Sequence, residues 1–476
     1  MLLTKEIARK PSMPDQSWSS IEAYGKWLFN FSDVLLTGKA GGKIISAKRR
    51  QRLQQMISFA RQHSKFYRKK YAQVPLGECA LHLLPPVTKP ELMQHFDDWV
   101  TDPAITRAGA ESFIADEWRI GRPFLGRYAL WSSSGTTGTP GIFVHDADAL
   151  SVYDALSAAR FRGVNAQRFI SGVPAGAKLA LIAARGQFAG AATWQRLRQT
   201  YPQIARTTRV FSVTAPLAEL VNSLNRFDPA YIASYPTVFQ ILAQEKHAGR
   251  LQAAVQGLWS GGEWLPEAAR ADIERIFGCP VIDEYGASEF MNIAFECAHR
   301  KLHLNSDWVW LEPVDEKYRP VPAGKPSATV LLTNLANRVQ PFIRYDLGDS
   351  VTLGAGACRC GSAFPLLHVE GRRDEILTMK NPQGRAVALL PLALSTALEE
   401  HAGVHHFQVI QTAPATLAVR FAASDQPNAM KIKVRKALKD FLAHQGLPNT
   451  RIRFDGIEPK PHGASGKFRR VWSARP

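Results

Sequence analysis

From about Arg127 onward, the sequence alternates short apolar runs with segments of helical periodicity. Several of these runs end in Gly, Ser, Asn or Pro, and they are Leu179–Ala183, Tyr231–Ala233, Gly257–Trp259, Val281–Asp283 and Thr329–Thr333. Such alternation is typical of layered α/β domains, in which ligand-binding loops leave the carboxyl ends of the strands. The sequence therefore predicts an α/β fold with a binding site at that edge.

The two ends of the chain depart from this pattern. The first hundred residues are predicted to be mainly helical. After Gly371 the pattern shortens to a compact α+β unit, with strands at Phe407–Gln411, Leu417–Phe421 and Arg451–Phe454 and a helix near Ala429–His444. We predict a large N-terminal α/β domain over residues 1–373 and a small C-terminal α+β domain over residues 374–476.

The composition is that of an ordinary globular protein, with 45% hydrophobic and 21% charged residues. No apolar run reaches the roughly 18 residues that a membrane span needs, and the N-terminus has no apolar core of a secretory signal. Five cysteines are too few for a disulfide framework in a chain of 476 residues. We therefore expect a cytoplasmic protein without membrane insertion, either a monomer or a homodimer.

The net charge of +18 is uneven along the chain. Between Lys431 and Pro476 there are twelve basic and three acidic residues, so this segment carries half of the excess. Such a field attracts nucleic acids, phosphorylated cofactors or acidic proteins. A basic, zinc-containing nucleic-acid-binding protein is therefore one alternative, which salt-dependent binding to DNA would favour. It leaves the motifs described next unexplained.

A polar segment with the sequence WSSSGTTGTP runs from Trp131 to Pro140. Gly135 and Gly138 permit positive φ angles, so that successive backbone N–H groups can form an anion-binding nest. Side-chain hydroxyls add donors for phosphate oxygens, and they belong to Ser133, Ser134, Thr136 and Thr137. The segment is not a Walker A loop, because it lacks G-x-x-x-x-G-K-[ST]. It predicts a phosphate-binding loop, with a polar turn as the plainer alternative.

Cysteine and histidine recur at a spacing that suits a metal. Cys297 and His303 form C-x5-H, and Cys358 and Cys360 form C-x-C further along the chain. Three thiolates and one imidazole would complete a closed tetrahedral site for structural Zn²⁺. His299 is the competing imidazole, and buried cysteines without a metal are the alternative.

Five motifs follow one another in an order and at intervals that resemble a known superfamily. They are the loop Ser133–Pro140, Glu284–Glu289 (EYGASE), Arg344–Asp349 (RYDLGD), Gly371–Asp374 (GRRD) and Ser465–Lys467 (SGK). The series resembles the adenylate-forming ligases, the ANL superfamily of acyl-CoA synthetases, peptide-synthetase adenylation domains and luciferases. The C-x-C element and HSKFY at His63–Tyr67 resemble its phenylacetate-CoA ligase branch. The resemblance covers nearly the whole chain.

The resemblance implies a site for ATP and Mg²⁺ in which the loop Ser133–Pro140 holds the β- and γ-phosphates. Tyr285 would lie against adenine, with Glu284 and Gly286 in the same loop, and Gly261 and Gly262 would approach the nucleotide through their backbone. Ser288 would contact the α-phosphate. Asp349 and Arg372 would bind the ribose. Glu289 would bind Mg²⁺, which favours carboxylate oxygen. One departure is that many relatives have a lysine after the loop proline, whereas this chain has Gly141. Neutralisation of the phosphate charge would then rely on backbone N–H groups, hydroxyls, Mg²⁺ or another base.

The resemblance also implies how the domains work together. Asp374 matches the hinge about which the small domain turns, and Lys467 matches the lysine that reaches the α-phosphate during adenylation. Tyr235, Pro236 and Gly261 would border the pocket for the acid. The zinc ion would tie the adenine-side loop to the ribose-side loop.

The function implied is that of an ATP-dependent acid–thiol ligase. It would adenylate a carboxylic acid, with an aromatic acid favoured, and would transfer the acyl group to coenzyme A, releasing AMP and pyrophosphate. An alternative acceptor is the phosphopantetheine arm of an acidic acyl carrier protein, which suits the basic C-terminal segment equally well.

Overall fold

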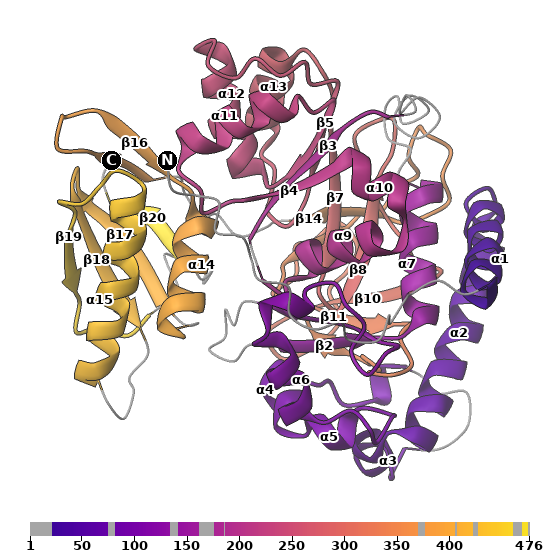
Figure 1. The fold of residues 1–476 in the computed structure, drawn as a ribbon. Helices are drawn as coiled ribbons and strands as arrows, with labels where there is room; N and C mark the ends of the chain where they lie inside the picture. Colours follow the sequence, from indigo (N-terminus) through magenta and orange to yellow (C-terminus); the bar gives the residue numbers. More distant parts are fainter. Residues whose placement is uncertain are drawn as a thin grey trace.

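The computed structural model describes residues 21–74, 81–133, 141–160, 176–184, 186–369, 377–404, 407–421, 427–459 and 469–474 (Figure 1). Helices dominate the first part of the chain, as predicted. They are α1 (Ile21–Thr37), α2 (Gly42–His63), α3 (Lys65–Lys70), α4 (Lys89–Gln94), α5 (Phe96–Trp99), α6 (Arg107–Ile114) and α7 (Ala147–Arg160), with short 3-10 turns at Leu81–Leu83 and Glu117–Arg119. Within these described ranges, no helix is long and apolar enough to span a membrane.

A nine-stranded sheet with the order β13-β14-β9-β8-β7-β6-β5-β3-β4 forms the centre of the large part. Its parallel strands are β3 (Leu179–Ala183), β4 (Thr208–Ser212), β5 (Tyr231–Ser234), β6 (Gly257–Ser260) and β7 (Val281–Ala287). Its antiparallel strands are β8 (Phe290–Glu296), β9 (Leu302–Leu304), β13 (Val351–Leu353) and β14 (Leu366–Val369). Four of the five predicted strands lie in the parallel half, where burial on both faces makes strands continuously apolar.

Helices cover both faces of the parallel half. They are α9 (Ala189–Thr200), α10 (Pro202–Thr207), α11 (Leu217–Phe227), α12 (Pro236–His247) and α13 (Glu267–Phe277). The helices α11, α12 and α13 pack on the face that includes Ile182 and Leu258. Trp194 of α9 packs on the opposite face, over Leu181 and Ala183. The parallel strands carry apolar side chains on both faces of the sheet, so helices can pack against each face.

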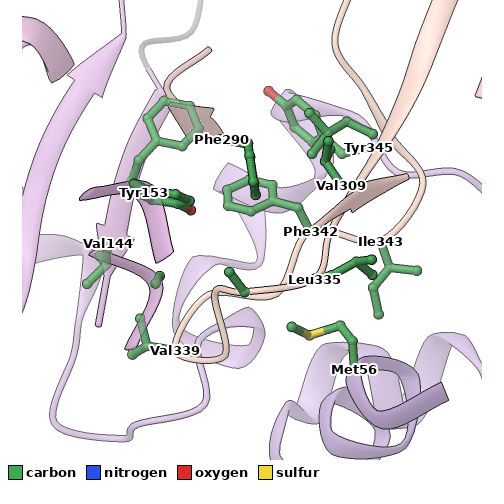
Figure 2. Close-up of a cluster of buried hydrophobic side chains, with 14 of the residues drawn as sticks. Met56, Val144, Tyr153, Phe290, Val309, Leu335, Val339, Phe342, Ile343 and Tyr345 are labelled. Atoms are coloured by element: carbon green, nitrogen blue, oxygen red, sulfur yellow. The ribbon is translucent and has the colours of Figure 1, made fainter. Parts of the chain in front are cut away.

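Two smaller sheets carry the rest of the large part. β1 (Ala129–Ser133) and β2 (Gly141–His145) form a hairpin, and β10 (Val309–Val314), β11 (Thr329–Asn334) and β12 (Tyr345–Asp346) form a three-stranded sheet. The fifth predicted strand is β11, and its membership of a different sheet depends on contacts that are distant in sequence. Phe290, Phe342 and Tyr345 converge from separate segments into the core between these elements (Figure 2).

The C-terminal part is an α+β unit, as predicted (Figure 1). Its elements are the hairpin β15 (Leu377–Lys380) and β16 (Ala386–Leu389), α14 (Pro391–Ala402), β17 (Phe407–Ala413), β18 (Thr416–Phe421), α15 (Pro427–His444), β19 (Arg451–Phe454) and β20 (Val471–Ser473). The last four strands form a sheet with the order β19-β18-β17-β20. The predicted domain boundary at 373/374 lies outside the described residues and stays a prediction. The α/β fold class is confirmed.

A buried ion pair ties the N-terminal helices to the central sheet. The Arg160 guanidinium of α7 donates to both carboxylate oxygens of Asp307, at 2.7 and 2.6 Å, and both side chains are at most 4% exposed. Arg52 of α2 donates to the Asp307 carbonyl at 2.8 Å. The short segment before β10 is thus clamped by two helices.

Replacing Asp307 with alanine should lower the free energy of unfolding by about 3–5 kcal/mol, because it leaves the Arg160 charge buried without its partner. Thermal unfolding followed by circular dichroism would measure the change. The control is Asp440→Ala, which removes the partner of Lys436 in an exposed pair on α15 and should cost at most about 1 kcal/mol. Equal small shifts for both variants would contradict the prediction.

Candidate active site

The tight turn between β7 and β8 consists of Ser288 and Glu289, since Ala287 pairs with Phe290. Three side chains from other elements hold its backbone. Trp131 of β1 donates its indole N–H to the Ser288 carbonyl at 3.0 Å, and His145 of β2 lies 3.1 Å from the same oxygen. Asn334 at the end of β11 donates to the Glu289 carbonyl at 2.8 Å. The hairpin β1–β2 is therefore fastened to this turn.

The same hairpin carries the residues that flank the predicted phosphate loop. Ser133 pairs with Gly141 at its end, so the residues on either side of the loop are neighbours. The loop residues themselves, Ser134 to Pro140, lie outside the described part of the chain. The Trp131 and His145 rings stack with their centroids 4.1 Å apart, which stiffens the base of the hairpin.

His145 is held as a neutral imidazole. Its Nδ1 lies 3.3 Å from the side-chain N–H donor of Asn337, so Nδ1 must accept and the proton must be on Nε2, which donates to Ser288. Protonation of Nδ1 would place its N–H against the side-chain N–H of Asn337. Burial lowers the pKa of His145 to about 3.

Glu289 is a buried carboxyl at the same turn, with 5% of its surface exposed. Burial raises its pKa, while the positive charge of Lys89 and a hydrogen bond from Tyr345 act in the opposite direction. Lys89, the first residue of α4, also lies with its Nζ 3.4 Å from Ser133 Oγ. Lys89 therefore contacts the Ser133 hydroxyl and acts electrostatically on the Glu289 carboxyl.

Tyr285 and Asp349 were predicted separately for adenine and ribose, and they lie together. The Tyr285 phenol donates to the Asp349 carboxylate at 2.9 Å. Tyr285 is buried in the large core on the β7 strand, and Asp349 follows β12. One carboxylate oxygen of Asp349 therefore accepts a hydrogen bond from Tyr285. The pair joins the predicted adenine side of the nucleotide site to its predicted ribose side.

Two glycines are needed for close approach at this edge of the sheet. Gly262 has a φ of +78°, and a Cβ atom there would lie 3.0 Å from the Tyr235 ring. Gly286 lies in the β7 bulge, where a Cβ atom would come within 1.9 Å of the Met291 carbonyl oxygen. Gly261 donates its N–H to the Ser234 carbonyl at 3.2 Å. Any side chain at Gly286 would push β7 and β8 apart.

The predicted acid-pocket residues lie at the start of α12. Tyr235 precedes the helix and Pro236 is its first residue, a position that suits proline. Glu263 accepts from both the N–H and the hydroxyl of Thr237, at 3.2 and 2.7 Å. The carboxylate after Gly262 therefore caps α12 and fixes the helix against the glycine turn.

The four predicted metal ligands form one cluster. All their ligand atoms lie within 4.8 Å of one another. Cys297 Sγ is 3.8 Å from Cys358 Sγ, and Cys360 Sγ is 3.4 Å from His303 Nε2. His303 Nδ1 lies 2.9 Å from the Phe364 carbonyl, which places the proton on Nδ1 and leaves Nε2 able to coordinate. The competing His299 instead donates its backbone N–H to Cys297 Sγ at 3.4 Å.

Three further predicted residues, Arg372, Asp374 and Lys467, lie outside the described residues. Sequence reasoning missed Lys89, although the pattern held a signal. A lysine as the first residue of a helix opposes the helix dipole, so its presence there suggests a role beyond helix stability. The roles of Trp131, His145 and Asn334 gave no such signal, because each acts through a backbone carbonyl far away in sequence.

Comparison with known proteins shows a matching domain and a matching fold. Residues 128–330 match the family model of the AMP-binding enzymes. The chain superimposes on 2-hydroxyisobutyryl-CoA ligase in complex with 2-HIB-AMP and CoA in the thioesterification state with a TM-score of 0.58. The sequences are 20% identical, and the match covers 98% of this chain and 94% of that one. The same ligase in the postadenylation state with 2-HIB-AMP gives a TM-score of 0.55.

The chain has the fold of this ligase. Residues 128–330 form a domain of the AMP-binding enzyme family, which agrees with the motif series, and the phenylacetate-CoA ligase-like branch stays a prediction. Protein CapK from Staphylococcus aureus is 24% identical over 255 residues, which are 52% of this chain. The match spans about half the length of that relative, 54%.

His145 should make the protein sensitive to acid. Its unfolded pKa is near 6.5 and its folded pKa is about 3, so the unfolded chain binds the proton first. The contribution is complete above pH 6.5 and is lost as the pH falls toward 3, by about 1.4 kcal/mol per pH unit. Unfolding midpoints measured from pH 8 to pH 4 should show the stability difference between wild type and His145→Gln narrowing below pH 6.5. A constant difference would contradict a neutral buried imidazole.

Proposed function

We propose that the protein is an ATP-dependent acid–thiol ligase that adenylates an aromatic carboxylic acid and transfers the acyl group to coenzyme A. The observation that carries this proposal is that Lys89 contacts Ser133 and acts on the buried Glu289 carboxyl, which also interacts electrostatically with Asp349, the partner of Tyr285. Phosphate, metal and ribose ligands would then lie close together, around a segment that matches the AMP-binding enzymes.

In the first step, a carboxylate oxygen of the acid attacks the α-phosphorus of ATP. The bond from that phosphorus to the bridging oxygen breaks, and pyrophosphate leaves. The loop with Ser133, Ser134, Gly135, Thr136, Thr137 and Gly138 would hold the leaving phosphates, and Ser288 and Lys467 would contact the α-phosphate. Lys89 would supply the positive charge that Gly141 cannot. Such charges act most strongly where charge develops in the transition state.

The remaining nucleotide contacts follow from the pair at β7. Tyr285 would lie against adenine, and Asp349 would accept from the ribose hydroxyls with Arg372 beside it. Glu289 would hold Mg²⁺, because a buried carboxylate is a suitable ligand for a hard cation and the positive charge would offset its burial. The cation would screen the phosphate charges during attack.

In the second step, the thiol of coenzyme A loses its proton and its sulfur attacks the acyl carbonyl, so that AMP leaves. The small domain would turn about Asp374 between the steps. The phosphopantetheine arm of an acyl carrier protein remains a second candidate acceptor. It is favoured by the basic residues on α15, which are Lys431, Lys433, Arg435, Lys436 and Lys439.

The first test is pyrophosphate exchange into ATP with a panel of carboxylic acids and Mg²⁺. Lys89→Ala should lower the exchange rate by about 10²-fold or more, the range for one lost electrostatic contact in the transition state. The matched control is Lys70→Ala. Lys70 pairs with Glu91 of the same helix α4 at 2.6 Å, so this variant reports on helix placement alone. Silence with every acid would contradict the ligase, and equal losses in both variants would contradict the role of Lys89.

Structural zinc is the second part of the proposal. Two sulfurs bound about 2.3 Å from one tetrahedral ion lie about 3.8 Å apart, and the Cys297–Cys358 separation is 3.8 Å. This distance is far too long for a disulfide. The backbone N–H of Ser362 also donates to Cys360 Sγ, at 3.4 Å. The ion would join the loop after β8 to the segment between β13 and β14.

Elemental analysis of protein purified without chelator should find one zinc per chain. Cys358→Ser should lower the metal content and the melting temperature, because an incomplete ligand set binds the ion weakly and zinc binding contributes to folding. Cys279→Ser is the control, since this buried cysteine packs in another core cluster. Metal-free wild-type protein, or unchanged zinc in Cys358→Ser, would contradict the site.

A further inference from the structure

Glu284 is the residue before Tyr285 on β7, and neighbouring side chains of a strand point to opposite faces. Tyr285 reaches Asp349 on one face. Glu284 lies on the other face, where the Trp259 indole N–H donates to its carboxyl group. The register agrees, because Trp259 pairs with Ile282, two residues before Glu284. Glu284 therefore faces away from the Tyr285–Asp349 pair.

The surroundings of Glu284 are aromatic. Trp259 and Trp194 of α9 lie with their ring centroids 6.1 Å apart at an interplanar angle of 74°. Together with Tyr235 they pack around the small side chains Ala183 and Ala233, and all three aromatic rings are only partly buried. These residues lie at the carboxyl ends of β3, β5 and β6, the edge where parallel sheets bind ligands.

The carboxyl group of Glu284 can accept more than one hydrogen bond. Its Trp259 partner occupies one acceptor position, and a carboxyl group offers several. An apolar ligand against this face would bury the remaining positions without a partner, which is costly.

We propose that Glu284 selects the substrate by accepting a hydrogen bond from a hydroxyl or amino substituent of an aromatic acid, whose ring packs against Trp194 and Trp259. This inference rests on the proposed ligase function and narrows its substrate class. The substituent lies on the acid, remote from the carboxylate that attacks ATP, so Glu284 is a specificity-determining residue.

The protonation state of Glu284 determines how its carboxyl group pairs with the substituent of the acid. Burial raises its pKa to about 8, so at neutral pH the free protein holds a neutral carboxyl that pairs with a hydroxyl as acceptor. An aromatic amino group is uncharged at neutral pH and would likewise donate an N–H to the carboxyl oxygen. Glutamine keeps the acceptor oxygen, and leucine removes it.

The experiment compares wild type with Glu284→Leu and Glu284→Gln. The acids are benzoate and phenylacetate with their hydroxy and amino derivatives, and the readouts are pyrophosphate exchange and quenching of tryptophan fluorescence by the acid without ATP. Wild type should prefer one substituted class over the parent acid by about ten- to hundredfold, as expected for one buried hydrogen bond. Glu284→Leu should abolish the preference. Glu284→Gln should retain it, because the amide oxygen still accepts a hydrogen bond.

Asp283→Asn is the matched control. Asp283 precedes Glu284 on the same strand, faces α13, and has a pKa that burial raises to about 7. This variant should alter stability and leave the preference among acids unchanged. An unaltered preference in folded Glu284→Leu, or an equal loss in Asp283→Asn, would overturn the inference. If no acid in the panel supported pyrophosphate exchange, the proposed ligase function would be contradicted instead. The fluorescence titration would still test the role of Glu284.

Discussion

The Ser288–Glu289 turn is the point on which the candidate site depends. Three elements that are distant in sequence donate to its two carbonyl groups, through Trp131, His145 and Asn334. A backbone carbonyl accepts with strict geometry, so each donor fixes the position of the element that carries it. These contacts fix two elements relative to β7 and β8. One is the hairpin β1–β2, whose strands flank the predicted phosphate loop, and the other is the three-stranded sheet.

The charges around this turn are balanced by residues from the N-terminal helices. Lys89 acts on the buried carboxyls of Glu289 and of Glu399 in α14, which belongs to the C-terminal part. Arg160 and Arg52 similarly converge on the Asp307 segment before β10. The helical N-terminal region therefore does more than cover the sheet, because it supplies cations to buried carboxyl groups elsewhere in the chain.

The faces of β7 separate two tasks. Tyr285 and Asp349 join on the side proposed for the nucleotide, and Glu284 joins Trp259 on the side proposed for the acid. A strand that alternates its side chains can line both sites at once. The bulge at Gly286 precedes the turn of Ser288 and Glu289, so that β7 and its turn carry residues of all three proposed positions, for the acid, the nucleotide and the metal.

Much of the fold could be predicted because burial leaves a local trace. Parallel strands such as Leu179–Ala183 are apolar throughout. The cysteine spacing predicted the cluster of Cys297, His303, Cys358 and Cys360, and the structure brings these four residues together. The motif series indicated the superfamily for the same reason, since glycine and hydroxyl residues are needed locally to form a phosphate loop.

The sequence alone determined most of the element types and indicated the AMP-binding domain, because these depend on neighbours within a few positions. Only the tertiary structure decided that Lys89 lies beside Ser133, that the imidazole of the cysteine cluster is His303, and that Glu284 faces Trp259. These relations join residues far apart in the chain, and no local pattern encodes a contact whose partner is set by the packing of whole layers.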